Sequence, residues 1–311
     1  MHKAHYRGRF APSPTGPLHF GSLVAAVGSF LEARHHQGIW LVRMEDLDTP
    51  RCVPGAADDI LRTLDAFGLH SDEPIIYQSQ RTAAYDEVLQ HLRDSGAAYP
   101  CCCTRKEIAD SALHGIEGFV YSGTCRDGMA HQRATPAWRV RTNRPSSPIA
   151  FDDALQGPIS QNLESDIGDF VVKRADGLFA YQLAVVADDA FQHITHIVRG
   201  ADLLNSTPRQ IHLQNLLGLP TPNYMHLPIA VNEAGEKLSK QTLAQAVNSE
   251  QAVHELWRAL TFLQQQPPHE LKYEDMDRVW EWARQNWRPD KLVGLRALSA
   301  VTNELDHRRH E

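Results

Sequence analysis

The sequence predicts an α/β protein in which a parallel sheet is split by an insertion and followed by a short helical region. An apolar segment ending at Phe10 and a second one at residues 39–44 are typical of strands, and the apolar positions between them recur at helical spacing. Strand, helix and strand in this order open a parallel sheet, where ligands bind beyond the carboxyl ends of the strands. Four cysteines then gather within 25 residues, and helical periodicity returns after Gln241.

The turn after the first strand is rich in proline. Residues 12–17 contain three prolines and one glycine, so the turn can be the interior of neither a strand nor a helix. The helix that follows carries His19, Gly21 and Ser22 in its first turn. A helix N-terminus presents backbone N–H groups and the positive end of the helix dipole, which together favour a phosphate. The residues alone also allow an ordinary proline-rich loop capped by a helix.

The second strand ends in an acidic segment. Glu45, Asp46 and Asp48 place three carboxylates within four residues. Carboxylates at a strand end suit a cationic amino group or a metal ion, and a solvated acidic turn is the alternative.

The clustered cysteines favour a metal site over disulfides, because the N-terminus lacks the apolar core of a secretory signal. Strand alternation would place Cys101 and Cys103 on one side and point Cys102 away. A capping-box pattern at Thr104 and Glu107 predicts a short helix that returns the chain toward Cys125.

Cys101, Cys103 and Cys125 leave a tetrahedral Zn²⁺ one ligand short. His114 and Tyr121 are both near enough in sequence to supply it. Inert, reduced thiols are the alternative to a metal site.

The second half of the sheet is expected to resume after about residue 165. The segment Phe170–Lys173 and the run 178–186 flank Asp176-Gly177 and predict a hairpin, and Ile194–Arg199 predicts a further strand. Within the insertion, Trp138 and nearby arginines would contact RNA or contribute to a β-rich packing surface. Beyond Gln241 we expect helices at 243–263, 275–287 and 292–305.

Composition narrows the class of protein. The 311 residues are 42% hydrophobic and 22% charged, as in ordinary globular proteins, and the formal net charge is −7. That charge argues against nucleic-acid binding by bulk electrostatics, although a local basic groove remains compatible with it. Because no apolar run approaches the ~20 residues that span a bilayer, we expect a cytoplasmic protein without a membrane partner.

Several motifs together resemble one family. Arg9-Phe10-Ala11-Pro12-Ser13-Pro14-Thr15-Gly16-Pro17-Leu18-His19-Phe20-Gly21 resembles the first signature of the glutamyl-type class I aminoacyl-tRNA synthetases. Lys237-Leu238-Ser239-Lys240 resembles their second signature, Lys-Met-Ser-Lys-Ser, and Arg43–Asp48 resembles their Arg-x-Glu-Asp-x-Asp segment. The cysteines and Tyr121 match the Cys-x-Cys…Tyr-x-x-x-Cys zinc pattern of the queuosine-directed members of this family. Ser22 and Gln241 depart from the signatures, where the family usually has histidine and serine.

The resemblance implies a Rossmann-like class I catalytic core. Its halves would be residues 1–99 and 166–235, with a zinc-bearing connective insertion at 100–165 and a signature loop and C-terminal helical region at 236–311. The chain is expected to form glutamyl-adenylate from L-glutamate and ATP with Mg²⁺, using His19, Lys237 and Lys240 for catalysis. The resemblance assigns ATP binding to His19, Gly21, Ser22, Lys237 and Lys240, glutamate binding to Arg9, Ala11, Ser13, Glu45, Tyr181 and Arg199, and one structural Zn²⁺ to Cys101, Cys103, Tyr121 and Cys125.

The expected RNA partner follows from the length of the helical region. Only about 70 residues follow Gln241, whereas the full-length glutamyl synthetases continue into a larger anticodon-binding region. The resemblance is therefore closest to the members that attach glutamate to queuosine in the anticodon loop of tRNA(Asp), with the anticodon stem-loop in the cleft. We expect a monomer. The alternatives are a truncated glutamyl-tRNA synthetase that charges a tRNA 3′ end, and a tRNA-binding paralogue without chemistry.

Overall fold

The computed structural model describes residues 5–111, 114–115, 118–129, 131–132, 134–143, 147–232, 235–238 and 245–300. In this part of the chain, no helix has the length and apolar character needed to cross a membrane.

The first half of the molecule is the expected strand–helix–strand unit. Strand β1 (Arg7–Phe10) leads through the proline-rich turn into helix α1 (Phe20–His35), and β2 (Ile39–Met44) follows. Strand β2 pairs in parallel with β1 and with the short β3 (Ile76–Tyr77). Between β2 and β3 lie the 3-10 turn η1 (Thr49–Arg51) and helix α2 (Ala56–Ala66), and η2 (Gln78–Gln80) follows β3.

A second, mixed sheet adjoins the first. Strand β11 (His196–Gly200) pairs in parallel with β12 (Asn223–Leu227), which also meets β8 (Ile149–Asp153) at Tyr224 and Asp153. Strand β9 (Gly157–Gln161) is antiparallel to β8. The backbone N–H of Thr195 donates to the carbonyl of Arg7 at 3.0 Å, so β11 runs beside β1. The carboxyl ends of β1, β2, β11 and β12 therefore face one region.

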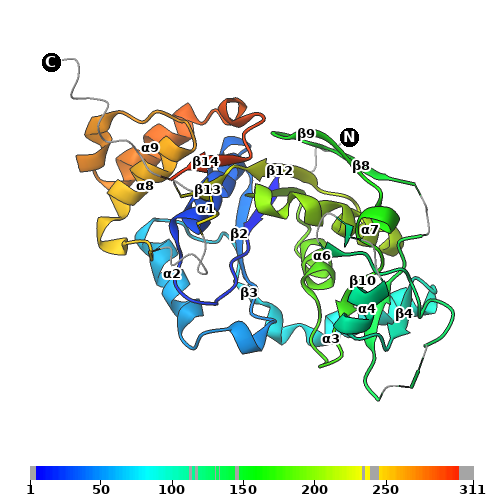
Figure 1. Cartoon of the computed structure of the whole chain (residues 1–311). Helices are drawn as coiled ribbons and strands as arrows, with labels where there is room; N and C mark the ends of the chain where they lie inside the picture. The colour runs from blue at the N-terminus through cyan, green and yellow to red at the C-terminus, as the bar shows by residue number, and fades with distance from the viewer. Residues whose placement is uncertain are drawn as a thin grey trace.

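Three strands from residues 98–173 form a separate antiparallel layer. Strands β4 (Ala98–Cys101), β7 (Ala137–Val140) and β10 (Phe170–Lys173) make a three-stranded sheet with β7 in the middle. This sheet lies with α3 (Thr82–Asp94) and α4 (Arg105–Ser111) at the opposite end of the molecule from the C-terminal helices (Figure 1). The remaining elements here are β5 (His114–Gly115), β6 (Gly118–Phe119) and α5 (Leu163–Asp166).

The predicted hairpin after Asp176-Gly177 is wrong. A turn does form there, with an isolated bridge between Lys173 and Phe179, but the chain then enters helix α6 (Tyr181–Phe191). The run 183–187 is buried on every side, so its apolar residues show no helical period that would distinguish it from a buried strand. Helix α7 (Thr207–Leu217) follows the 3-10 turn η3 (Ala201–Ser206) and begins at Thr207-Pro208.

The C-terminal region packs against α1. The helices α8 (Ala252–Phe262) and α9 (Met276–Asn286), in orange, lie beside α1, in blue (Figure 1). Trp287 donates its indole N–H to Glu32 on α1 at 2.6 Å, which fixes α9 to the sheet domain. Three 3-10 turns connect this region: η5 (Ser249–Gln251), η6 (His269–Tyr273) and η7 (Pro289–Leu292).

The last predicted helix, 292–305, is not found in its described part. Residues 297–299 instead form strand β14 (Ala297–Ser299), which pairs in parallel with β13 (Ile229–Val231). Hydrogen bonds to a distant strand outweigh the local helical pattern here, an effect that sequence periodicity does not contain.

Candidate active site

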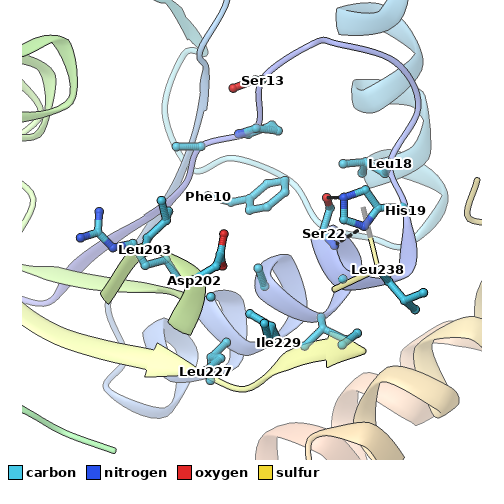
Figure 2. A pocket seen from close by; sticks show the side chains of 18 of the residues that line it. Phe10, Ser13, Leu18, His19, Ser22, Asp202, Leu203, Leu227, Ile229 and Leu238 are labelled. Carbon is cyan, nitrogen blue, oxygen red and sulfur yellow. Dashed lines mark hydrogen bonds between the residues drawn. The ribbon is translucent and has the colours of Figure 1, made fainter. Parts of the chain in front are cut away.

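A cavity of about 350 Å³ opens where the carboxyl ends of the parallel strands meet the first turn of α1. Figure 2 shows it between the proline-rich loop that carries Ser13, the start of α1 at His19, and the segment from Leu227 to Leu238. Ten of the predicted site residues line it: Arg9, Ala11, Ser13, His19, Gly21, Ser22, Glu45, Tyr181, Arg199 and Lys237. Lys240, the remaining predicted residue of this site, lies outside the described residues.

The first signature fixes the imidazole of His19 at the helix N-terminus. His19 is the N-cap of α1, with an extended backbone, and its Nδ1 accepts from the backbone N–H of Ser22 at 3.3 Å. The hydroxyl of Ser22 lies 3.2 Å from Nε2 of the same ring. Ser22, the departure from the family signature, thus holds His19. A Cβ on Gly21 would lie 3.3 Å from this ring, so glycine leaves the entrance to the helix open.

The first residue of the second signature and a segment that follows this signature both lie near the first signature. Val247 donates its backbone N–H to Leu18 at 2.8 Å, and Ala246 forms a bridge with His19. Within the second signature, Lys237 lines the cavity and its Nζ lies 2.6 Å from Asp202 Oδ2. Two segments more than 200 residues apart in sequence therefore share one cavity.

A buried charge network lies at the end of the cavity that Arg9 and Glu45 line. Asp189, on α6, accepts from Arg9 Nε at 3.0 Å and from Arg43 Nη1 at 2.7 Å. Arg43 also donates to Glu45 at 3.1 Å. Burial alone would raise the pKa of Asp189, but Arg43 and Arg9 hold this pKa below its usual range. Asp189 is therefore charged and compensates both arginines.

Glu45 differs from Asp189 in its electrostatics. Burial raises the pKa of Glu45, and the attraction of Arg43 and Arg9 only partly opposes the rise. A cationic amino group beside Glu45 would favour its charged form. The site can thus accept an ammonium group at Glu45.

Arg199 has neutral partners instead. Its guanidinium donates to His226 Nε2 at 3.1 Å, to Thr207 Oγ1 at 2.8 Å and to the hydroxyl of Tyr181 at 3.4 Å. Sequence reasoning identified Arg199 and Tyr181 but missed Asp189 and His226. The only signal for these two was a polar residue inside an otherwise apolar run.

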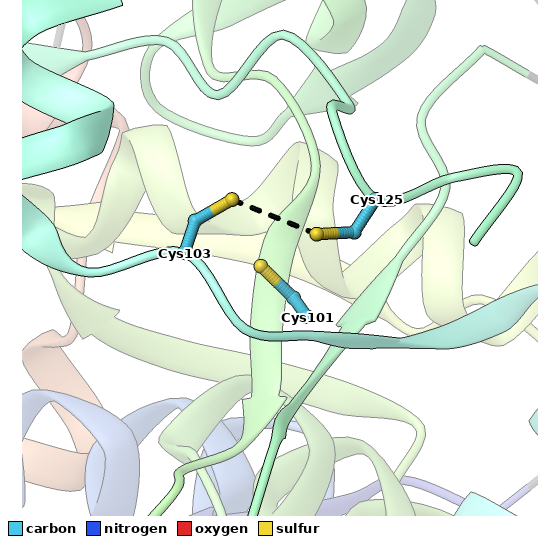
Figure 3. A group of neighbouring side chains, drawn as sticks. All are labelled: Cys101, Cys103 and Cys125. Carbon is cyan, nitrogen blue, oxygen red and sulfur yellow. Dashed lines mark hydrogen bonds between the residues drawn. The ribbon is translucent and has the colours of Figure 1, made fainter. Parts of the chain in front are cut away.

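The predicted metal ligands come together away from the cavity. The sulfurs of Cys101, Cys103 and Cys125 all lie within 4.8 Å of one another, with Cys103 and Cys125 at 3.6 Å (Figure 3). The hydroxyl of Tyr121 is 3.3 Å from the sulfur of Cys101 and 3.5 Å from that of Cys103. Ligands about 2.3 Å from a tetrahedral Zn²⁺ are about 3.8 Å apart, so these four groups fit one zinc ion.

One detail of the cysteine cluster contradicts the prediction, and a second was not predicted. Cys102 does not point away: its sulfur lies 3.6 Å from that of Cys125, because the chain leaves strand β4 at Cys101 and alternation ends there. In addition, Arg139 donates its Nε–H to the sulfur of Cys101 at 3.3 Å. The side chain of His114, the other possible ligand, lies outside the described part of the structure.

Comparison with known proteins gives one consistent family. Residues 5–262 match the family model described as tRNA synthetases class I (E and Q), catalytic domain. A protein of Dechloromonas aromatica named glutamyl-Q tRNA(Asp) synthetase is 61% identical over 289 residues, 92% of this chain and 95% of its own length. One of the same name from Cupriavidus metallidurans is 62% identical over 262 residues, 83% of this chain and 84% of its own.

Two solved structures share the fold. The glutamate–tRNA synthetase of Elizabethkingia anophelis superimposes with a TM-score of 0.79 at 23% identity, covering 97% of this chain and 69% of that one. The glutamate tRNA ligase of Elizabethkingia meningosepticum, solved in complex with its amino acid, gives a TM-score of 0.78 at 24% identity, with 96% and 67% covered.

Proposed function

The chain belongs to the class I tRNA synthetases of the E and Q type, in the group named glutamyl-Q tRNA(Asp) synthetase, and we propose that it activates L-glutamate with ATP and transfers the glutamyl group to queuosine in tRNA(Asp). The observation that carries this proposal is the single cavity lined by residues of both signatures and by the predicted glutamate-binding residues. We assign the halves of the catalytic domain to residues 1–99 and 166–235, the connective insertion to 100–165 and the signature loop with the C-terminal region to 236–311.

ATP would bind at the α1 end of the cavity. His19 and the N-terminus of α1 would contact the phosphates, Gly21 would leave room for the adenosine, and Ser22 would orient His19. Lys237 and Lys240 would neutralise the pyrophosphate as it forms. Mg²⁺ enters with ATP and offsets part of the phosphate charge. The contacts of Ala246 with His19 and of Val247 with Leu18 support a position of the second signature near the ATP phosphates.

Glutamate would bind at the end lined by Arg9, Ala11, Ser13, Glu45, Tyr181 and Arg199. Glu45 is suited to the α-ammonium group, and Arg199 with Tyr181 to the side-chain carboxylate. The α-carboxylate oxygen then attacks the α-phosphorus of ATP, a P–O bond to the leaving pyrophosphate breaks, and glutamyl-adenylate forms. The protein contributes positioning and charge stabilisation.

Zn²⁺ would be held by Cys101, Cys103, Tyr121 and Cys125 and would be structural. The four groups are at ligand-to-ligand distance, and they join the end of β4 to the segment 121–125. When bound, the ion supplies a crosslink between these two segments. The anticodon stem-loop of tRNA(Asp) is the RNA that we expect in the cleft, and we propose a monomer that acts in the cytoplasm.

Transfer of labelled glutamate tests the proposal. Radiolabelled glutamate and ATP are incubated with queuosine-containing tRNA(Asp), with tRNA(Asp) that lacks queuosine and with tRNA(Glu). We expect label only on the queuosine-containing tRNA(Asp). Label confined to the 3′ adenosine of tRNA(Glu) would instead identify a truncated glutamyl-tRNA synthetase, and no activation of glutamate would leave a tRNA-binding paralogue.

A further inference from the structure

The three arginines near the glutamate end of the cavity differ in how their charge is compensated. Arg9 and Arg43 each contact the carboxylate of Asp189, and Arg43 also contacts Glu45. Arg199 has no carboxylate within ion-pair distance among the residues that the structure describes, although it is 5% exposed. Its contacts are the neutral groups of His226, Thr207 and Tyr181. Arg199 is thus the buried cation whose charge is left for a ligand.

His226 can contact Arg199 only in one tautomer. A guanidinium is purely a donor, so Nε2 of His226, at 3.1 Å from Arg199 Nε, must be the acceptor and must lack a proton. The ring proton is therefore on Nδ1, which donates to Asp153 Oδ2 at 2.6 Å. Histidine tautomers are commonly set in this way by a carboxylate on the other ring nitrogen.

Asp153 is itself held in place. Its Oδ1 accepts from the backbone N–H groups of Leu155 at 3.0 Å and Gln156 at 2.9 Å, next to the end of β8. Asp153 is 3% exposed and His226 is 0% exposed, so neither side chain reaches solvent. Burial would raise the pKa of Asp153, but the hydrogen bond from His226 and its neighbours keep this pKa below the usual range. The carboxylate is therefore ionised and accepts the proton of Nδ1.

We propose that Asp153 and His226 are positioning residues for the amino-acid site, which fix the guanidinium of Arg199 to receive the side-chain carboxylate of the substrate. This inference rests on the proposed function, which gives that carboxylate to Arg199. A neutral imidazole orients the guanidinium without cancelling its charge, whereas a carboxylate at the same place would compete with the substrate. The carboxylate of Asp153 does not contact Arg199; it fixes the tautomer of His226, which in turn orients Arg199.

The charges around His226 make the arrangement sensitive to acid. Arg199 faces the ring from β11, Asp153 from β8 and Asp202 from η3, and Tyr224 of the same strand stacks on it with ring centroids 6.1 Å apart. Burial and then Arg199 lower the pKa of His226, against the opposite effect of Asp153 and Asp202. His226 is neutral at neutral pH, and protonating it would remove the acceptor and place a second cation beside Arg199.

The test is ATP–pyrophosphate exchange with glutamate, measured with tRNA(Asp) present, which separates KM for glutamate from kcat. His226→Leu should raise KM for glutamate ~10- to 100-fold, the effect of losing a hydrogen bond to a charged group, and should change kcat much less. His226→Gln keeps an acceptor at the Nε2 position and should restore a KM within about threefold of wild type. Asp153→Asn presents an N–H to Nδ1, reverses the tautomer and should raise KM as His226→Leu does.

The matched control is His212→Leu. His212 is 1% exposed, its Nε2 donates to the backbone carbonyl of Arg141 at 2.7 Å, and it does not line the cavity. We expect its KM for glutamate to equal that of the wild type.

The outcomes separate the two claims. If the wild-type protein does not exchange pyrophosphate with glutamate, the proposed function fails, and the inference fails with it. If the wild type is active and a folded His226→Leu variant has an unchanged KM, the inference alone is overturned. Should His226→Leu fail to fold, the pH profile of His226→Gln decides. We expect KM of the wild type to rise in acid and that of His226→Gln to rise less, and identical profiles would overturn the inference.

Discussion

Asp189 shows how a single buried side chain can support both the fold and the site. Its two oxygens contact Arg9 and Arg43, and the three side chains are at most 5% exposed. A buried pair of this kind adds little net stability compared with apolar residues, but removing one partner leaves an uncompensated charge. Arg9 and Glu45 were predicted from sequence motifs. The role of Asp189 could not be predicted, because it depends on the packing of α6 against the strands that carry Arg9 and Arg43.

Asp189→Ala should therefore lower the free energy of unfolding by about 3–5 kcal/mol, since Arg9 and Arg43 would lose their shared buried partner. Urea denaturation measures the change. Asp290→Ala is the control, because Asp290 pairs with Arg288 on the surface, and its midpoint should barely move. Equal midpoints for the two variants would show that Asp189 is not holding the buried arginines.

Buried histidines predict loss of stability in mild acid. Burial lowers the pKa of His212 and His226 below the value of 6.5, so the unfolded chain binds these protons first. The free energy of unfolding should therefore be highest, with respect to these groups, above pH 6.5. It should decrease as the pH drops toward the pKa values of the folded state, by at most about 1.4 kcal/mol per pH unit for each histidine. Denaturation between pH 5 and pH 8 measures this slope. His212→Gln should make it shallower, and an unchanged slope would contradict the prediction.

At the scale of elements, the sequence predicted the parts whose local pattern and tertiary role agree. The unit β1–α1–β2 and the capping box at Thr104 formed as expected. Helix α6 and strand β14 were missed for a common reason: distant packing decides their conformation. The run 183–187 is buried on all sides, and β14 depends on pairing with β13.

The cysteine site was predicted by spacing and resemblance, since Cys101, Cys103 and Cys125 are brought together by the end of β4 and the turn after Tyr121. The prediction that Cys102 points away from the other cysteines was wrong, because the alternation of side chains ends where strand β4 ends. The contact between Asp153 and His226 was not predicted either. It depends on the pairing of β8 with β12, which no local sequence motif indicates.

Cys103→Ser should reduce zinc content from one ion per chain to well below one, and should lower the melting temperature, because the ion would crosslink β4 to the segment that contains Cys125. Elemental analysis and thermal denaturation measure the two effects. Cys52→Ser is the matched control, because the thiol of Cys52 donates to the backbone carbonyls of Asp46 and Asp48 and is not part of the cysteine cluster, so zinc should be unchanged. Zinc that is retained in full by Cys103→Ser would remove this cysteine from the ligand set.

At the scale of the whole molecule, the cavity depends on segments from both ends of the chain. The helices α8 and α9 pack on α1, and residues 246–247 are thereby carried to His19. Lys237 and Leu238, the described residues of the second signature, line the same cavity as the first signature. Sequence order alone could not establish this meeting.

Lys240→Ala should slow adenylate formation by about 100-fold or more, because it removes a cation from the developing pyrophosphate, and should leave the melting temperature unchanged. Pyrophosphate exchange measures the rate. Lys272→Ala is a suitable control, since Lys272 lies over the ring of Trp257 in the C-terminal region. If both variants exchange at the wild-type rate, Lys240 does not take part in activation.

The central claim is that both signatures surround one ATP while Arg199 holds the side chain of glutamate. A crystal structure with a non-hydrolysable glutamyl-adenylate analogue tests it most directly. We predict the adenosine against Gly21, the phosphate mimic near His19 and the side-chain carboxylate on Arg199. An analogue bound outside this cavity, or bound within it with its carboxylate away from Arg199, would contradict the account.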